Sequence, residues 1–325
     1  TGGRQQAPGT AGKRRMGRKD TAGKVFFSDK ERFAELMNVH LFCGNKTVLG
    51  EHLIRRDRDY PSLSGVYGEK KRDILIEDKS RNLYFGMELE TESDYSMPER
   101  IMVYDACEYE CQIREIYGSH RKKGEFKEYR EKKSRIKETD LLHPVVTVVL
   151  YLGEGHWEGK RSLSQLFGIA KTDAEQLKAR LHDYDFLLIE ADYVNPEDYS
   201  TDLRQFFQAM QSRRDRKRLK GLLESEDFRK LELEAEQAIA AHLHVKKLFC
   251  RMNREGISMC QAFDELMKEE RLNGKREGKR EGEKAGKKKE RFSIVRKMHK
   301  KGMEEALIRE LTGCTKKEFA AATGR

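Results

Sequence analysis

The chain has 325 residues, with 38% charged and 37% hydrophobic side chains and a formal net charge of +10. This length allows one sizeable domain with an appendage or two small domains, and the low apolar share indicates that part of the chain is solvated helix or tail. No apolar run approaches the ~20 residues of a membrane-spanning helix and no segment resembles a signal peptide, so we expect a cytoplasmic protein with no membrane partner.

Positive charge is concentrated in two segments. Residues 1–19 hold six lysines and arginines and no acid, and residues 271–290 hold nine against four glutamates. Clustered cations favour a polyanion such as DNA, because neutralising phosphates releases condensed counterions, although either segment would also suit a plain solvated tail. Residues 1–18 are predicted to form a disordered basic tail, in which Met16 is a candidate natural start.

The first predicted helix covers about 29–42. Ser28 and Glu31 have the spacing of a capping box, and apolar residues follow at helical spacing until residues 43–45 end the helix. Residues 45–70 look irregular.

A predicted antiparallel hairpin follows. Residues 73–77 and 83–88 are short apolar runs joined by a polar turn over 78–82, which indicates two strands. Pro98 stands in the first turn of a helix that opens at Ser96 and reaches about 117. The charged residues 119–140 predict an exposed helix or loop.

The second half of the sheet is predicted from two apolar, β-branched runs, 144–151 and 186–190. A helical segment lies between them near 172–182, and helices follow over 200–211 and 215–245. This order predicts an α/β fold, with a mixed sheet flanked by helices and a helical C-terminal extension.

Glycine recurs every fourth residue in GKREGKREGEKAG, within residues 271–290, which predicts a charged linker or a weak helix. Residues 291–325 suggest two short helices joined by a turn. That arrangement is compatible with a DNA-reading helix-turn-helix or with a plain two-helix appendage.

No zinc site is expected from the six cysteines, none of which forms a C-x-x-C pair. Cys107 and Cys111 share one face of a predicted helix without a companion ligand, and His242 and His244 are interpreted as surface or packing residues. A reducing cytosol is the natural setting.

Candidate chemistry lies on the hairpin. Asp73 begins its first strand and Glu88 and Glu90 end its second, so carboxylates from neighbouring strands can converge. Oxygen ligands suit Mg²⁺ or Mn²⁺, with the backbone carbonyl of Leu89 as a further ligand and Glu35 as a possible outer carboxylate. Solvated surface acids are the plain alternative, since acid-rich hairpins are common.

Four segments in this order resemble the Rpn family of recombination-promoting nucleases, also described as PD-(D/E)XK nuclease family transposases. They are KDTAGKVFFSDKERFAELMN, KKRDILI, YFGMELETESDYSMPERIMVYDACEY and VVTVVLYLGEGHWEGKRSLSQLF. The segment DLRQFFQAMQSRRDRKRLKGLL is similar to the family variant that has a long helical C-terminal region. The resemblance runs mainly from Lys19 to Trp157.

The resemblance implies a restriction-endonuclease-like fold and a metal-dependent DNA endonuclease associated with recombination or mobile elements. It makes Asp73 the first metal ligand and Glu88 the second. The third motif position is usually Lys or Gln, which orients water or phosphate, but here it is Glu90. This departure puts activity in doubt, because a carboxylate cannot donate to phosphate, although Glu90 would suit a second metal.

The resemblance also completes the predicted domain organisation. The basic tail is followed by a nuclease-like domain, a helical extension, the charged linker and a small helical segment, with boundaries at 1–18, 19–215, 216–270, 271–290 and 291–325.

Four cations are candidate DNA contacts. Arg100 follows Met97-Pro98 as in the family and could clamp a phosphate, or it could pair with Glu99 or Asp105. Lys70, Lys71 and Arg72 precede Asp73 and would meet the DNA backbone or lie in a solvated loop. Trp157 is interpreted as a packing residue.

Three functions remain in competition. The leading hypothesis is a Mg²⁺-dependent DNA endonuclease, in which a homodimer would be possible. The second is a weakened nuclease scaffold that binds DNA without cutting it, and the third is a helical interaction protein. No G-x-x-x-x-G-K-[ST] loop and no G-x-S-x-G elbow occurs, so a P-loop ATPase and an α/β-hydrolase are not expected.

Overall fold

The computed structural model describes residues 21–58, 72–168, 177, 180–243 and 257–324. The chain divides after Cys260 into unit 1, Thr1–Cys260, and unit 2, Gln261–Arg325, and each is considered by itself. The predicted tail over 1–18, most of the predicted helix near 172–182, and His244 lie outside the described residues.

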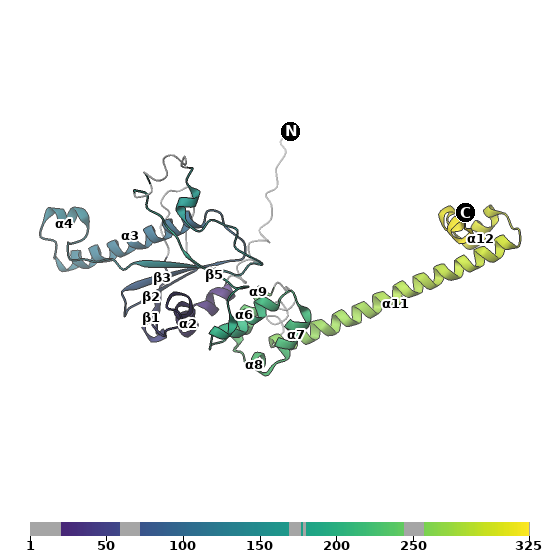
Figure 1. Cartoon of the computed structure of the whole chain (residues 1–325), viewed down its shortest axis with the longest axis horizontal. Helices are drawn as coiled ribbons and strands as arrows, with labels where there is room; N and C mark the ends of the chain where they lie inside the picture. Colours follow the sequence, from purple (N-terminus) through teal and green to yellow (C-terminus); the bar gives the residue numbers. More distant parts are fainter. Residues whose placement is uncertain (1–20, 59–71, 169–176, 178–179, 244–256, 325) are drawn as a thin grey trace, which may run out of the picture. The chain divides into compact units, whose positions relative to one another are not determined.

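Unit 1 is built on a five-stranded sheet in the order β1-β2-β3-β4-β5 (Figure 1). The strands are β1 (Leu53–Arg55), β2 (Ile74–Asp78), β3 (Leu83–Glu90), β4 (Val145–Tyr151) and β5 (Leu187–Glu190). The first three are antiparallel neighbours, whereas β4 runs parallel to β3 and β5 runs parallel to β4. The predicted hairpin and the predicted mixed α/β sheet are therefore confirmed.

The strands form where apolar and β-branched residues follow one another without a helical period. Every residue of β2 is buried, as are the last five of β4, which is typical of strands covered on both faces. Asn82 takes a left-handed conformation with a φ of 51° in the turn between β2 and β3. The three-residue strand β1 was not predicted, because so short a pattern does not stand out from its loop.

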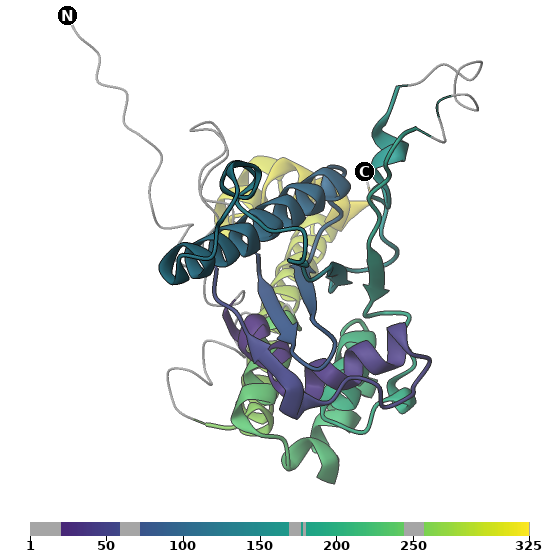
Figure 2. The same ribbon diagram turned by 90° about the vertical axis from the view of Figure 1, so that its left-hand side faces the viewer.

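Helices cover both faces of the sheet. Figure 2 shows α3 along one face, with α2 and α6 on the opposite side. The rings of Phe33 on α2 and Phe85 on β3 meet with centroids 5.9 Å apart. Residues 21–27 are also helical. The other described helices of this unit are α2 (Lys30–Leu41), α3 (Met97–Lys123), α4 (Tyr129–Ser134), α6 (Leu203–Ser212), α7 (Arg216–Glu224), α8 (Glu226–Arg229) and α9 (Leu233–His242), with 3-10 turns at Gly50–His52, Leu163–Leu166 and Pro196–Asp198.

Two helix predictions need correction. Asp29 caps α2, not Ser28, because the Asp29 side chain accepts the N–H groups of Glu31 and Arg32. Ser28 instead donates its hydroxyl to the carbonyl of Lys24 in the preceding helical turn. The single helix predicted over 215–245 is divided into α7, α8 and α9, since the backbone is extended at Ser225 and at Glu232.

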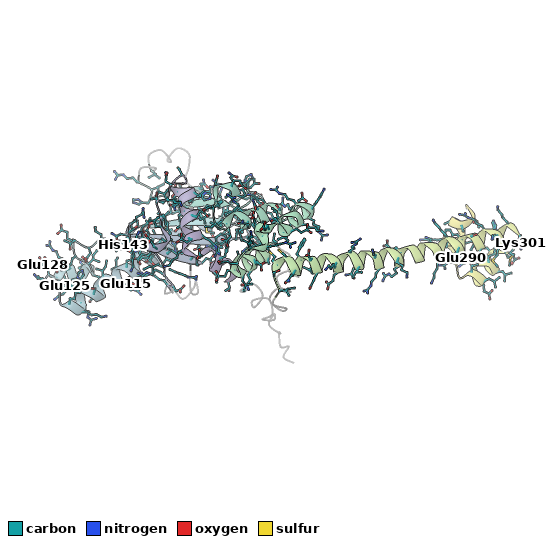
Figure 3. All side chains as sticks on the ribbon, turned by 90° about the horizontal axis from the view of Figure 1, so that it is seen from below. Glu115, Glu125, Glu128, His143, Glu290 and Lys301 are labelled. Atoms are coloured by element: carbon teal, nitrogen blue, oxygen red, sulfur yellow. The ribbon has the colours of Figure 1, made fainter. Side chains whose placement is uncertain are left out.

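The far end of α3 is exposed and strongly charged. The helix continues to Lys123, past its predicted end near 117, and stops at Gly124 in the left-handed region. The short α4 that follows has no buried residue. Figure 3 shows Glu115, Glu125 and Glu128 around this part of unit 1. The prediction of an exposed charged segment over 119–140 is confirmed.

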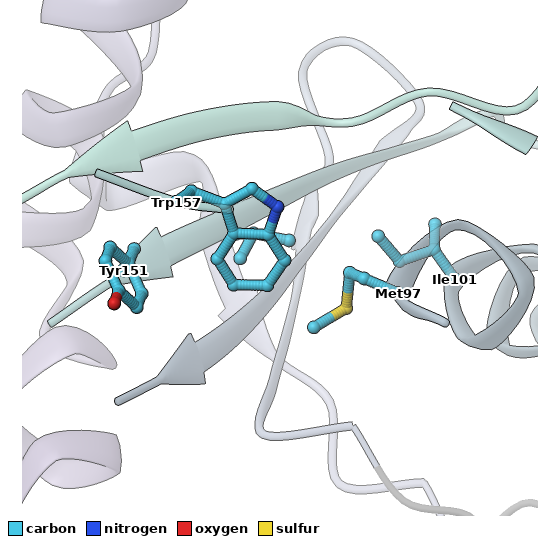
Figure 4. Packing of buried hydrophobic residues seen from close by; sticks show 5 residues of the cluster. Met97, Ile101, Tyr151 and Trp157 are labelled. Atoms are coloured by element: carbon cyan, nitrogen blue, oxygen red, sulfur yellow. The ribbon is translucent and has the colours of Figure 1, made fainter. Parts of the chain in front are cut away.

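A hydrophobic cluster packs around the single tryptophan, beyond the end of β4 (Figure 4). Trp157 is 6% exposed and packs with Met97, Ile101, Val149 and Tyr151. Its ring meets the ring of Tyr151 edge-on, with centroids 5.4 Å apart. The interpretation of Trp157 as a packing residue is confirmed, and the cluster fixes the start of α3 against the sheet.

Unit 2 contains the greater part of α11 (Met259–Lys300), with α12 (Glu305–Thr312) and α13 (Lys316–Thr323). The charged repeat over 271–290, predicted to be a linker or a weak helix, is helical and lies inside α11. Its Lys, Arg and Glu residues are good helix formers, although each glycine costs ~1 kcal/mol of helix stability. No helix in the described part of the chain is both long enough and apolar enough to cross a membrane.

Candidate active site

Two carboxylates meet where the β2–β3 ladder ends. Ile74 and Met87 form its last backbone pair, so Asp73 and Glu88, one position further, are cross-strand neighbours. Asp73 Oδ2 accepts the N–H of Leu89 at 2.9 Å, which continues the ladder through a side chain. The structure therefore brings the two predicted ligands together at the C-terminal end of β3.

Glu88 is a buried carboxyl group. It is 2% exposed, and its Oε1 has no hydrogen-bond partner among the described residues. Burial, together with the nearby charge of Asp73, raises the pKa of Glu88 to about 8. Burial and the Glu88 charge also raise the pKa of Tyr104, on α3, to about 12. An unsatisfied buried carboxyl oxygen costs free energy, so this atom is placed to bind a cation or a proton.

Arg100 closes the opposite side of the site. It forms an ion pair with Glu90, its Nη1 lies 3.1 Å from Asp94 Oδ2, and its Nη2 lies 3.6 Å from Glu88 Oε2. Burial raises the pKa of Glu90 above its ordinary value, although Arg100 opposes this shift. Arg100 thus pairs with neither predicted acid, Glu99 or Asp105. Its guanidinium faces the carboxylates of the motif itself.

A lysine that was not singled out from the sequence completes the cluster. Lys24 Nζ lies 2.8 Å from Asp73 Oδ1, and the Lys24 side chain remains 27% exposed. It belongs to the helical residues 21–27 that precede α2. No local pattern links Lys24 to the hairpin, and only its place in the first resembling segment pointed to it. The cluster therefore contains a flexible, partly solvated ammonium group next to the carboxylate pair.

A small basic hollow of about 120 Å³ opens beside Asp73. Its lining consists of Lys24, Arg55, Arg56, Asp57, Arg58, Arg72, Asp73 and Leu75. Each of the five cations is paired with an acid, but the side chains of Lys24, Arg55 and Arg56 remain partly exposed, so the hollow can still attract phosphate. The arginines of β1 and its following loop were missed because residues 45–70 showed no period.

A larger hollow, of about 520 Å³, has the opposite charge. It is lined by Thr91, Glu92, Ser93, Tyr95, Tyr151, Glu154, His156 and Glu158. Three glutamates without a lysine or arginine in the lining would repel a phosphate backbone. The basic hollow is therefore the better approach for a nucleic acid.

Arg72 does not reach solvent, contrary to its predicted place among DNA contacts or in a solvated loop. It is 4% exposed, forms an ion pair with Asp105, and donates through Nη1 to Thr147 Oγ1 at 2.8 Å. Its guanidinium also lies over the Tyr104 ring, 5.3 Å from the centroid. Arg72 therefore ties α3 to β4 behind the carboxylate pair, because the chain turns inward just before β2.

Gly86 makes room for this buried arginine, so we expect Gly86→Ala to destabilise unit 1 by about 3 kcal/mol or more. A Cβ at Gly86 would clash with Arg72 Nη1, which displaces the guanidinium and leaves the buried Asp105 without its cationic partner. Urea unfolding would measure the loss. Gly118→Ala is the control, because no atom lies within 4 Å of its Cβ in α3, and it is expected to stabilise slightly. Equal stability of the two variants would contradict the packing argument.

Glu35 lies elsewhere than expected for an outer metal ligand. Its carboxylate accepts the backbone N–H and the hydroxyl of both Ser200 and Thr201, just before α6. Burial alone would raise the pKa of Glu35, but these hydrogen bonds lower it below its ordinary value. Since four donors occupy the carboxylate, Glu35 serves to fix α2 to the loop. Lys70 and Lys71 lie outside the described residues.

The donor set at the hairpin limits what a metal could use. Among the described residues, no three His, Cys, Asp or Glu side chains converge in a way that could hold a metal ion. Two carboxylates remain, Asp73 and Glu88, with the peptide of Leu89 between them and the unsatisfied Glu88 Oε1. Such a set fits Mg²⁺, which commonly binds one or two carboxylates and completes its shell with water and phosphate oxygens.

Comparison with protein-family models, with curated proteins and with solved structures finds no significant match to this chain.

Proposed function

We propose that this chain is a metal-dependent DNA endonuclease with its active site at the end of the β2–β3 hairpin. The observation that carries the proposal is the cross-strand pair of Asp73 and Glu88, with a buried Glu88 Oε1 that has no hydrogen-bond partner. A restriction-endonuclease-like fold and a place in the Rpn family are part of the same proposal. They are supported by the mixed sheet with helices on both faces.

Asp73 and Glu88 would hold Mg²⁺ or Mn²⁺, together with the Leu89 carbonyl. Such a metal lowers the pKa of an attacking water and stabilises charge on the phosphoryl group. Lys24 and Arg100 neutralise the carboxylates in the metal-free protein, at 2.8 Å from Asp73 and in an ion pair with Glu90. A bound metal would supply that positive charge, and Lys24 and Arg100 would then be available to contact a phosphate.

Lys24 can also take the role that Lys or Gln usually has at the third motif position, where this chain has Glu90. Glu90 cannot donate a hydrogen bond to water or phosphate, but Lys24 Nζ lies at the same carboxylate pair from another element. The basic hollow beside Asp73 gives a phosphate backbone an approach that passes this ammonium group. We therefore assign to Lys24 the orienting role that the resemblance gives to Lys or Gln at position 90.

The proposal is tested by incubating supercoiled plasmid with Mg²⁺, Mn²⁺, Ca²⁺ or EDTA. We expect nicking in Mg²⁺ or Mn²⁺, none in EDTA, and loss of nicking in Asp73→Ala, because the metal loses its ligand. Glu92→Ala is the matched control, since Glu92 is an exposed acid just beyond β3. Cleavage that persists in folded Asp73→Ala, or that needs no metal, would place the chemistry elsewhere.

A second candidate is a DNA-binding protein on a nuclease scaffold that no longer cuts. The ion pair between Arg100 and Glu90 favours it, because a carboxylate held by an arginine at this position blocks the site unless a metal displaces the arginine. This candidate predicts DNA binding with a steep salt dependence and no product with any metal.

A further inference from the structure

We propose that unit 2 is a three-helix module that binds duplex DNA through α13 and the basic end of α11. The inference does not depend on the metal pair, because all its residues lie between Lys287 and Gly324. Three observations carry it: an independent core, a tight turn before α13, and a separation of positive from negative charge among the three helices.

The last turns of α11 pack with α12 and α13 around a core of their own. Val295, Ile308, Cys314, Phe319 and Ala322 are each at most 4% exposed and form one cluster. Each helix contributes to this core, and Cys314 comes from the turn between α12 and α13. A unit with its own core can present a fixed surface.

The connection between α12 and α13 has the form of a helix-turn-helix. Gly313 ends α12 in the left-handed region at a φ of 64°, and Thr315 caps α13 in a reciprocal capping box with Glu318. A three-residue turn containing glycine is typical of the motif, in which the second helix enters the major groove. The methyl side chains of Ala320 and Ala321 are small enough to let α13 approach bases closely.

Two arginines of α11 fix α13 at both ends. Arg291 Nη1 lies 3.4 Å from the carbonyl of Gly313 and 3.9 Å from Glu318. Arg296 Nε donates to the carbonyl of Ala322 at 2.7 Å. These contacts hold α13 against α11, and Arg296 and Lys300 of α11 line one hollow together with the end of α13.

Charge is divided between the helices of this module. Residues 287–324 hold eleven lysines and arginines against five glutamates. Figure 3 shows Glu290 and Lys301 near the ends of the α11 segment concerned. The exposed cations on this segment and α13 are Lys287, Lys288, Lys289, Arg296, Lys297, Lys300, Lys301, Lys316 and Lys317.

Of the five glutamates, Glu290 is exposed on α11, whereas the other four are engaged in contacts or lie at α12. Glu318 is engaged in the capping box, and Glu305 pairs with Arg309 at 3.8 Å within α12. Glu304 and Glu310 are exposed at the two ends of α12. The surface of α11 and α13 is therefore the positive one, and duplex DNA fits it better than a protein surface, since both charge and a groove-sized helix are supplied.

The test measures binding of the full chain to a short labelled duplex by fluorescence anisotropy in EDTA. Asp73→Ala serves as the background so that nothing is cut and binding is separated from nuclease activity. Lys316→Ala with Lys317→Ala is expected to weaken binding roughly tenfold near physiological salt. The slope of log affinity against log salt should fall by about two, one for each phosphate contact.

The matched control is Lys132→Ala with Lys133→Ala, an adjacent exposed lysine pair on α4 in unit 1. It removes the same charge and should change neither affinity nor slope. The inference is overturned if both double variants lose affinity equally, or if neither does. It is also overturned if the Lys316/Lys317 effect appears with anionic phospholipid vesicles and not with the duplex. If only the plasmid-cleavage test fails, the proposed nuclease activity is contradicted but DNA binding by unit 2 is not.

Discussion

Glu88→Gln is expected to abolish metal-dependent cleavage and at the same time to stabilise the metal-free protein. Cleavage should fall at least on the order of a hundredfold, the effect of removing one charge-stabilising group from an active site. Glutamine has the shape of glutamate, but it cannot supply the negative oxygen that a divalent metal needs at this buried position. Plasmid nicking in Mg²⁺ measures the first effect, and urea unfolding in EDTA measures the second.

The gain in stability follows from the pKa of Glu88, which burial and Asp73 raise from 4.5 to about 8. The folded protein therefore holds a proton on Glu88 at pH values where the unfolded chain has released it. Relative to a carboxyl group with a pKa of about 8 in both states, the raised pKa of Glu88 costs no stability below about pH 4.5. As the pH rises from about 4.5 towards about 8, the free energy of unfolding falls. Glu88→Gln removes this pH dependence. At about pH 8 its free energy of unfolding should therefore exceed that of the wild type by a few kcal/mol, on the order of magnitude that the pKa shift gives.

Glu92→Gln makes the same chemical change at an exposed acid and should alter neither cleavage nor the pH profile. A Glu88→Gln variant that cuts at the wild-type rate would remove Glu88 from the metal site. A variant that loses both activity and stability would show that the carboxylate of Glu88 is needed in ionised form by the metal-free fold, against the burial argument.

The sheet could be predicted from the sequence because its central strands carry their signal locally. β2 begins with the apolar residues Ile74, Leu75 and Ile76, β4 is apolar and β-branched over Val145–Tyr151, and the polar turn after Asp78 fixes the hairpin. Once the hairpin is given, Asp73 and Glu88 must face each other, so the central pair of the site follows from register alone. Its burial does not, because the depth of Glu88 depends on α3.

Contacts between distant elements could not be predicted in the same way. Arg72 follows two lysines in the sequence and looks like part of a solvated loop, yet Gly86 and Asp105 receive it in the interior. Glu35 lies on a helix that faces the sheet, but Ser200 and Thr201 take up its carboxylate. In both cases the partner is supplied by an element whose position only packing determines.

Lys24→Met is expected to lower the rate of cleavage on the order of a hundredfold while leaving metal binding intact. Lys24 Nζ, 2.8 Å from Asp73 Oδ1, is the ammonium group that we expect to orient water or phosphate in place of the missing residue at position 90. Methionine is unbranched and replaces most of the apolar stem of lysine without its charge, so the packing of residues 21–27 should be preserved. Single-turnover cleavage at saturating Mg²⁺ gives the rate, and urea unfolding checks the fold.

Metal affinity separates this role from a merely structural one. In the metal-free protein Lys24 competes with a metal for Asp73, so its removal should leave Mg²⁺ affinity unchanged or increase it, even though cleavage becomes slow. Lys30→Met removes an exposed lysine at the start of α2 and should change neither quantity. If Lys24→Met weakens Mg²⁺ binding and slows cleavage in proportion, Lys24 only holds Asp73 in place. If it cuts normally, Glu90 or Arg100 must orient the reacting groups, and the departure from the motif would need another explanation.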